Sequence, residues 1–301
     1  MRILLPVDGS SFSKAAVSFI ASRDTLIQSR PRVELLNMQY RIPPPAARAL
    51  GKESVVAYQA AEADLVLKPA LARLHRAGLT AHARYVVGTV SDELASIMGA
   101  DKADLIVMGS HGHTGLKRLL FGSVASTVLA SCTTPLLLLR GKPAPRKDSL
   151  RLGIALDGSK YGIAAVRFVI KHRALFGVTP TVELIHVVPD LLNLVAPGYF
   201  RRVPATGLQP EQVEAMQAAA FEATMAPARK LLQNTGIAFT EVRLVGNTPG
   251  EQIATHATQR KFDVLVLGTH GRGALESTLL GSVATRTAAL SRVPLLFIRK
   301  T

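Results

Sequence analysis

The chain is poor in the residues that build disulfides, base-stacking surfaces and membrane spans. Its single cysteine, Cys132, excludes an internal disulfide and fits a reducing cytoplasm, as a buried structural thiol or a redox sensor. Tryptophan is absent and aromatic residues make up 5%, so no platform for stacking nucleic-acid bases is visible. No apolar run reaches the ~18–20 residues that span a bilayer, and residues 3–7 are too short for a signal peptide. We therefore expect a cytoplasmic protein without membrane association.

Acidic residues are also few, because 21 Asp and Glu stand against 36 Lys and Arg, which gives a net charge of +15. A charge of this size can mark a protein that binds nucleic acid or a membrane surface. The basic residues are scattered, however, and the densest group, at 140–147, has the composition of a solvated linker. Nucleic-acid association is therefore an alternative and not the main interpretation.

Several well-known site motifs are missing. Without Gly-x4-Gly-Lys-(Ser/Thr) the chain is not a P-loop NTPase, and without Gly-x-Gly-x2-Gly after the first predicted strand a dinucleotide site is not expected. The nucleophile elbow Gly-x-Ser-x-Gly is also absent, which argues against a hydrolase. His111 and His113 have the spacing of a metal pair, but only His111 recurs, as His270, so we predict no dedicated metal site.

An internal repeat organises what is present. Residues 4–10 return at 153–159, and residues 33–38 return at 182–187, so both segments are offset by the same distance. A length of 301 residues suits two domains of ordinary size. We predict a first domain at 1–141, a linker at 142–149 and a second domain at 150–301.

Each repeat alternates apolar strands with helices, which is typical of a doubly wound α/β fold. We expect two tandem parallel five-stranded sheets, each with strand order 3-2-1-4-5 and helices on both faces. The expected strands are 2–7, 33–39, 81–87, 104–108 and 135–140, then 151–156, 181–188, 238–245, 263–267 and 294–299. The expected helices are 11–28, 54–77, 89–100 and 122–132, then 160–174, 210–235, 248–260 and 281–291. The proline-rich segments 41–52 and 189–210 are predicted to be loops.

The last strand of each repeat, at 135–140 and 294–299, is expected at a sheet edge beside strand four. Both strands are apolar, and exposed apolar edges invite pairing. They could pair with each other and form an internal pseudo-twofold dimer within one chain. A further homodimer of two chains is left open.

A glycine-rich loop follows strand four in both repeats. Gly109 and Gly112 are followed by Gly122-Ser123, and the same spacing returns at 268–282. Backbone amides of such a loop and of the helix start that follows it form an anion site. Asp8 and Asp157 end the first strands and could bind a ribose or base, or cap the next helix. If strands one and four are neighbours, aspartate and glycine loop face each other across a crevice.

These features resemble the tandem members of the universal stress protein family over essentially the whole chain. In that family, Gly-x2-Gly-x9-Gly-(Ser/Thr) marks the branch that binds ATP, and both repeats keep it. The resemblance implies that the glycines and serines hold phosphates and ribose, that the aspartates lie by the adenosine, and that Met38 and Val187 contact adenine. The candidate nucleotide-binding residues are Pro6, Asp8, Met38, Met108, Gly109, Gly112, Gly122, Ser123, Val124, Asp157, Val187, Leu267, Gly268, Gly271, Gly281, Ser282 and Val283.

No lysine or arginine belongs to the glycine loop in both repeats, since Lys117-Arg118 becomes Glu276-Ser277. Fast phosphoryl transfer relies on groups that neutralise charge, so we do not expect a high-turnover enzyme. We expect a nucleotide-dependent stress-response module that binds ATP, with Mg²⁺ on the phosphates, at two sites. The alternatives are a slow ATPase that uses the same pockets, a nucleic-acid-associated protein, and a chain in which one half is only a scaffold.

Overall fold

The computed structural model describes residues 1–89, 93, 103–110, 121–131, 133–140, 145, 149–193, 209–269 and 280–299. Most of the predicted helix 89–100, of the loop 189–210 and of the linker 142–149 lies outside these residues, as does Cys132. Among the helices of the described ranges, none has both the length and the hydropathy of a bilayer-spanning segment.

Strands and helices alternate along both halves of the chain. The first half contains β1 (Arg2–Pro6), α1 (Ser11–Ala21), α2 (Asp24–Gln28), β2 (Arg32–Gln39), α3 (Pro44–Leu50), α4 (Lys52–Arg76), β3 (Ala81–Val87), β4 (Leu105–Gly109), α6 (Ser123–Ser131) and β5 (Leu136–Leu139). The second half contains β6 (Arg151–Ala155), α7 (Lys160–Lys171), the 3₁₀ turn η1 (Arg173–Leu175), β7 (Thr181–Val188), α8 (Pro210–Leu232), β8 (Ala238–Val245), α9 (Pro249–Gln259), β9 (Val264–Gly268), α10 (Ser282–Leu290) and β10 (Leu295–Ile298).

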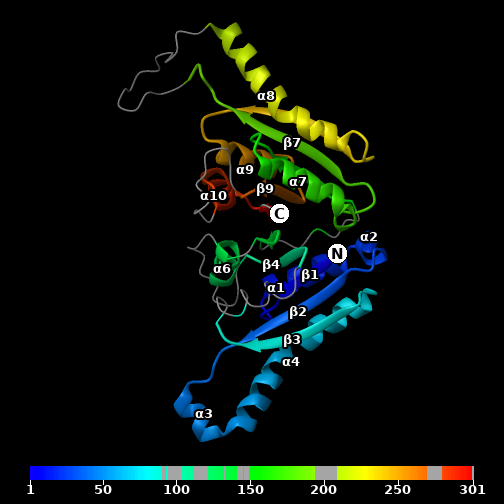
Figure 1. The fold of residues 1–301 in the computed structure, drawn as a ribbon, viewed down its shortest axis with the longest axis vertical. Helices are drawn as coiled ribbons and strands as arrows, with labels where there is room; N and C mark the ends of the chain where they lie inside the picture. Colours follow the sequence, from blue (N-terminus) through cyan, green and yellow to red (C-terminus); the bar gives the residue numbers. More distant parts are fainter. Residues whose placement is uncertain are drawn as a thin grey trace.

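The ten strands form one continuous sheet in the order β3-β2-β1-β4-β5-β10-β9-β6-β7-β8. Within each half the strands are parallel and follow the predicted order 3-2-1-4-5, so the fold class is confirmed. The two predicted five-stranded sheets are joined into one, because β5 and β10 pair. Figure 1 shows the two halves following one another along the long axis, with α3 and α8 at its two ends.

The pairing of β5 with β10 is antiparallel, with Leu137 opposite Leu296. It confirms the predicted pairing of the two apolar edges. Side chains of both halves add contacts across this pairing. The rings of Phe121 and Phe297 pack edge to face, with their centroids 6.1 Å apart. The guanidinium of Arg140 donates to the carbonyl oxygen of Ala288 in α10. The halves are therefore joined by backbone, aromatic and polar contacts.

Two apolar cores lie on opposite faces of this sheet, and each contains residues of both halves. Helices α1, α2, α4, α7 and α8 contribute to one core, and α6, α9 and α10 contribute to the other. Alternate residues of one strand feed the two cores, as Leu137 and Leu138 do in β5. Strands covered on both faces explain the continuous apolar runs of the sequence.

The predicted loop at 41–52 is wrong, because the segment contains α3 and the start of α4. Pro44 stands at the first position of α3, where the fixed φ of proline favours a helix. Pro45 follows it, and alanine, arginine and leucine, all good helix formers, make up the rest of α3.

The single helix predicted at 11–28 is two helices, α1 and α2. Between them Arg23 leaves the helical conformation, with φ −106° and ψ 82°. Its side chain is buried, and its Nη2 atom donates to the carbonyl oxygen of Pro145 at 2.9 Å. This long-range contact between α1–α2 and the segment that joins the two halves is not readable from local propensity.

Leu137 tests the junction, because its side chain is fully buried and it lies opposite Leu296. We expect Leu137→Ala to lower the free energy of unfolding by about 2–5 kcal/mol, from lost burial and the cavity left behind. Leu65→Ala is the matched control, since Leu65 is 70% exposed, and should change stability by less than about 0.5 kcal/mol. Urea unfolding followed by circular dichroism measures both, and equal effects would contradict the role of the junction.

Candidate functional site

The turn after the first strand of each half is built in the same way. Gly9 and Gly158 take φ of 82° and 78°, a conformation that favours glycine. The Asp8 Oδ1 atom accepts from the Ser10 amide at 3.0 Å, and Asp157 Oδ1 accepts from the Ser159 amide at 2.9 Å. One carboxylate oxygen of each aspartate therefore closes the turn in which that aspartate lies.

The helix caps belong to the serines and not to the aspartates. Ser10 Oγ accepts from the amide of Ser13 at the start of α1, and Ser159 Oγ accepts from Gly162 in α7. The capping alternative for Asp8 and Asp157 is therefore wrong. Both aspartates are half-buried at the carboxyl end of their strands.

Strand order places each aspartate turn beside the end of strand four. β1 lies between β2 and β4, with Ile3 opposite Leu105, and β6 lies between β7 and β9, with Leu152 opposite Val264. The chain leaves the two central strands in opposite directions, which is where open α/β sheets form a ligand crevice. Asp8 lies in the turn just after β1, and Gly109 is the last residue of the neighbouring β4. Asp157 and Gly268 have the same places relative to β6 and β9.

Gly109 and Gly268 are the last residues of β4 and β9, and close packing explains why they are glycine. A Cβ on Gly109 would lie 2.3 Å from the Phe12 Cβ atom and 2.8 Å from its carbonyl carbon. A Cβ on Gly268 would lie 2.8 Å from the Cβ of Tyr161. The first turns of α1 and α7 thus approach these strand ends too closely for any side chain.

Hydrogen bonds fix both ends of the segment that follows. The Ser110 amide donates to Leu139 in β5, and the Gly122 amide donates back to the Ser110 carbonyl at 2.8 Å. In the second half Thr269 donates to Ile298, and Gly281 donates to Thr269 at 2.7 Å. The predicted loop residues Gly112, Gly271, His111, His113 and His270 lie outside the described residues.

Helices α6 and α10 begin directly after Gly122 and Gly281, which donate these hydrogen bonds. Gly281 is the N-cap of α10 and has no side chain with which to cap it, and Gly122 precedes α6 in the same way. Neither helix has an acidic residue in its first turn. Within the described residues α10 has no side-chain cap, and the positive ends of both helix dipoles favour an anion at these sites.

A comparison with models of known protein families also finds two matching units in the chain. The model of the universal stress protein family matches residues 1–140 and again residues 150–299. The chain belongs to the universal stress protein family. It is 26% identical to a universal stress protein of Mycolicibacterium smegmatis over 305 residues, which are 99% of this chain and 96% of that relative.

A solved structure that spans the whole chain has the same architecture. A universal stress protein from Archaeoglobus fulgidus aligns with a TM-score of 0.66 at 19% identity, covering 99% of this chain and 96% of its own. Another structure, of a universal stress protein in complex with cAMP, is 25% identical, covers 46% of this chain and 94% of its own, and has a TM-score of 0.32.

The remaining candidate residues of this universal stress protein divide between core and surface. Pro6, Met108 and Leu267 are buried in the sheet. Met38 and Val187 are half-buried near the ends of β2 and β7, next to the strands that carry the aspartates. Val124 is half-buried at the start of α6, and Val283 is exposed at the start of α10.

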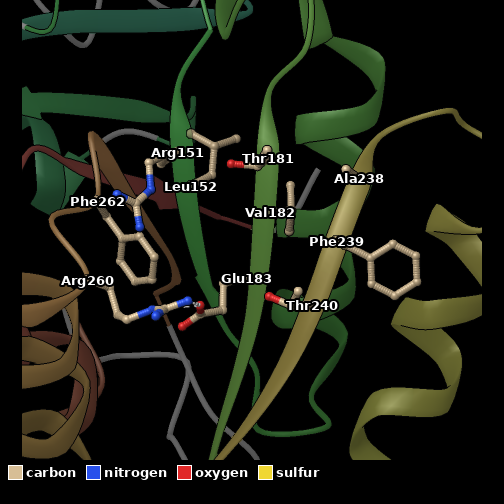
Figure 2. Close-up of a pocket in the computed structure, with 10 residues that line it drawn as sticks. All are labelled: Arg151, Leu152, Thr181, Val182, Glu183, Ala238, Phe239, Thr240, Arg260 and Phe262. Carbon is tan, nitrogen blue, oxygen red and sulfur yellow. Dashed lines mark hydrogen bonds and ion pairs between the residues drawn. The ribbon is translucent and has the colours of Figure 1, made fainter.

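Sequence reasoning missed a buried polar cluster at the opposite, amino-terminal edge of the sheet. Glu183, on β7, has a side chain only 6% exposed, and it accepts from His256 Nε2 of α9. Arg260 donates to its other oxygen through Nε at 3.0 Å and Nη2 at 2.8 Å. Figure 2 shows Arg260 reaching Glu183 beside Phe262, on the wall of a cavity of about 240 Å³.

The clue to this cluster was a glutamate repeated at the same position of β2 and β7, Glu34 and Glu183. In the first half Glu34 pairs instead with Arg84 of β3. The corresponding cavity there is larger, about 480 Å³, with Ala103 lining it in place of Phe262. The two halves thus kept the carboxylate and changed what surrounds it.

Gly109 tests the close approach of α1 to β4. We expect Gly109→Ala to destabilise the protein by about 1–3 kcal/mol through overpacking. Phe12→Ala should not rescue it, because the clash involves the Phe12 Cβ atom and backbone. Gly246→Ala is the control, since the three atoms nearest to a Cβ there all belong to the flexible side chain of Gln252. Thermal unfolding distinguishes them, and full rescue by Phe12→Ala would refute this geometry.

Glu183 tests the buried cluster. Glu183→Ala leaves His256 and Arg260 without their acceptor, so we expect a loss of about 2–3 kcal/mol, moderated because Arg260 is half-exposed. Glu34→Ala is the matched control, since that side chain is 28% exposed, and should cost about 1 kcal/mol or less. Urea denaturation compares the two, and an equal or larger loss for Glu34→Ala would contradict this assignment.

Proposed function

We propose that this protein binds ATP at two crevices, one in each half, and acts as a nucleotide-dependent regulatory module in the stress response. The observation that carries the proposal is the strand order, which sets the Asp8 turn beside the end of β4 and the Asp157 turn beside the end of β9. Adenine nucleotide is the one partner that we propose, in the cytoplasm and with Mg²⁺ on its phosphates.

The phosphate end of each crevice is assigned to the glycine segment and the helix that follows. The backbone amides at the start of α6 and α10 are assigned as donors, and the helix dipoles add positive charge there. Ser123 and Ser282 stand at the first helical positions, where their hydroxyls reach a phosphate or ribose oxygen. The close backbone approach at Gly109 and Gly268 leaves the strand ends free of side chains.

The nucleoside end is assigned to the first and second strands. Asp8 and Asp157 each hold their turn through Oδ1, and their carboxylates are assigned to a ribose hydroxyl. Met38 and Val187 directly follow Asn37 and His186, whose side chains contact these turns. We assign the backbone groups of Met38 and Val187 to the edge of the adenine. Gly112, Gly271, Val124 and Val283 complete the proposed site.

We also propose the corresponding domain division, with nucleotide-binding units at 1–141 and 150–301 joined by 142–149. Hydrogen bonds close the ends of both glycine segments equally, which supports two working sites rather than one site and a scaffold. Regulation by occupancy is favoured over rapid turnover, since the glycine segments share no cationic residue.

Ser123→Asp and Ser282→Asp test each site separately. A carboxylate in the first turn stabilises a helix through its dipole but repels a phosphate bound there. We therefore expect each substitution to weaken ATP binding at its own site by roughly tenfold or more, without lowering the melting temperature. Ser123→Ala and Ser282→Ala are the matched controls with smaller effects.

The measurement is isothermal titration with ATP and Mg²⁺, together with the adenine nucleotide released from denatured purified protein. We expect one ATP in each crevice of the natural chain, one crevice lost in each single variant, and both lost in the double variant. No binding by the natural chain, with or without Mg²⁺, would overturn the proposed function.

A further inference from the structure

A cavity lies at the amino-terminal edge of the sheet in each half, opposite to the edge that carries the proposed nucleotide crevices. The first-half cavity has a volume of about 480 Å³, and its counterpart in the second half has about 240 Å³. Pockets that bind small organic molecules typically measure ~300–1,000 Å³. The first-half cavity therefore has the size of a ligand site, whereas the second-half cavity does not.

Side chains of α9 and of the segment after it close the second-half cavity. His256 and Arg260 both donate to the Glu183 carboxylate. Phe262 packs against β6 so closely that a Cβ on Gly153 would lie 2.5 Å from its ring. Figure 2 shows Phe262 and Arg260 beside Glu183. The polar groups of this cavity thus satisfy one another, and the aromatic ring takes up space.

The first half replaces these closing groups. Ala103 lines its cavity in place of Phe262. The partner of Glu34 comes from within the sheet, since Arg84 of β3 donates to it through Nε. Among the described residues, the two terminal nitrogens of the Arg84 guanidinium have no acceptor. They are therefore available to a ligand at the wall of the cavity.

Strand register shows that the first-half cavity carries more basic residues than its counterpart. Arg32 lies opposite Arg2 on β1, and His82 lies opposite Glu34. The positions of Arg32, His82 and Arg84 are occupied in the second half by the neutral residues Thr181, Thr240 and Val242. The two cavities therefore differ in charge as well as in size.

The charge of these basic residues is only partly balanced within the cavity. Glu34 is the acidic residue of the described lining and is paired with Arg84. Outside the lining, Asp104 accepts from a backbone amide of β1 at 2.7 Å. Arg32 and His82 line the cavity, are exposed, and have no hydrogen-bond or ion-pair partner among the described residues. A guanidinium in this position favours a phosphate or a carboxylate.

The deepest part of the cavity lining is apolar. Ile3 and Leu4 of β1 and Val33 of β2 line the cavity, and each has no more than 3% of its surface exposed. The cavity therefore combines a basic, exposed rim with an apolar surface beneath it.

We propose that the first-half cavity binds a small organic anion, in which an apolar body carries a phosphate or a carboxylate group. Arg32 and the terminal nitrogens of Arg84 bind the anionic group, and His82 adds a ring nitrogen at the same rim. The apolar body lies on Ile3 and Val33. The site is separate from the nucleotide crevices and does not require that they bind ATP.

The experiment uses the full natural chain and three probes in the absence of ATP. Phenyl phosphate and benzoate carry the two anionic groups on the same apolar ring, and phenol is the neutral control. We expect saturable changes in the ¹H–¹⁵N spectra at the backbone amides of residues 32–34 and 80–84. Phenol should bind roughly fivefold more weakly or not at all. Binding of either anion supports the site, and the tighter probe identifies the preferred anionic group.

Arg32→Thr and His82→Thr copy the residues of the second half into the first-half cavity. Both side chains are exposed, so the variants should fold, which circular dichroism checks. We expect Arg32→Thr to weaken binding of the anionic probe by roughly fivefold, since one positive charge is lost, and His82→Thr to have a smaller effect. Arg48→Thr is the matched control, because it removes the same charge from an exposed position of α3 and should leave binding unchanged.

Several results would overturn this assignment. Spectral changes confined to the segments around Gly109 and Ser123 would place the probes in the nucleotide crevice instead. No saturable binding, equal binding of phenol, or an Arg32→Thr variant that binds as tightly as the natural chain would also contradict it. A chain that binds ATP but neither anionic probe retains the proposed function, and a chain that binds a probe but no ATP retains only this site.

Discussion

The antiparallel pairing of β5 with β10 is the interaction on which the rest of the molecule depends. Each strand has four residues, all buried. Alone, either would leave a fully apolar edge with unpaired backbone groups, which is a site for aggregation. Paired, they satisfy that edge and merge two sheets into one. Because alternate leucines of β5 enter opposite cores, the junction also makes each core common to both halves.

The candidate sites lie at the carboxyl ends of the central strands of each half. Strand order sets their position, whereas short-range contacts set their shape. The turn at Asp8 is held by its own carboxylate and by the serine cap of α1. It is also held by Asn37 of β2, whose Nδ2 atom donates to the Val7 carbonyl. The end of β4 is held by the first turn of α1, which contacts Gly109. One helix thus shapes both sides of the crevice.

Duplication preserved the backbone of this arrangement and changed individual side chains around it. The side-chain contact to the backbone carbonyl before the aspartate is kept, with Asn37 in one half and His186 in the other. The close approach of a helix to the end of strand four is also kept, with Phe12 in one half and Tyr161 in the other. At the opposite edge Glu34 and Glu183 recruit arginines from different elements. Such changes are tolerated because a backbone carbonyl needs a hydrogen-bond donor at one position, and more than one residue type can supply it. They also let two sites in one chain differ in chemistry.

The sequence by itself determined the repeat, the order of strands and helices, and the positions of the aspartate and glycine turns, because periodicity and glycine requirements are local. Strand order within each half followed, since parallel crossovers have few arrangements. Tertiary structure decided what depends on distant partners. The break at Arg23 depends on a carbonyl at Pro145, and the buried state of Glu183 depends on His256 and Arg260. The reason for glycine at position 109 is Phe12. These contacts join residues far apart in the chain, so no local pattern could specify them.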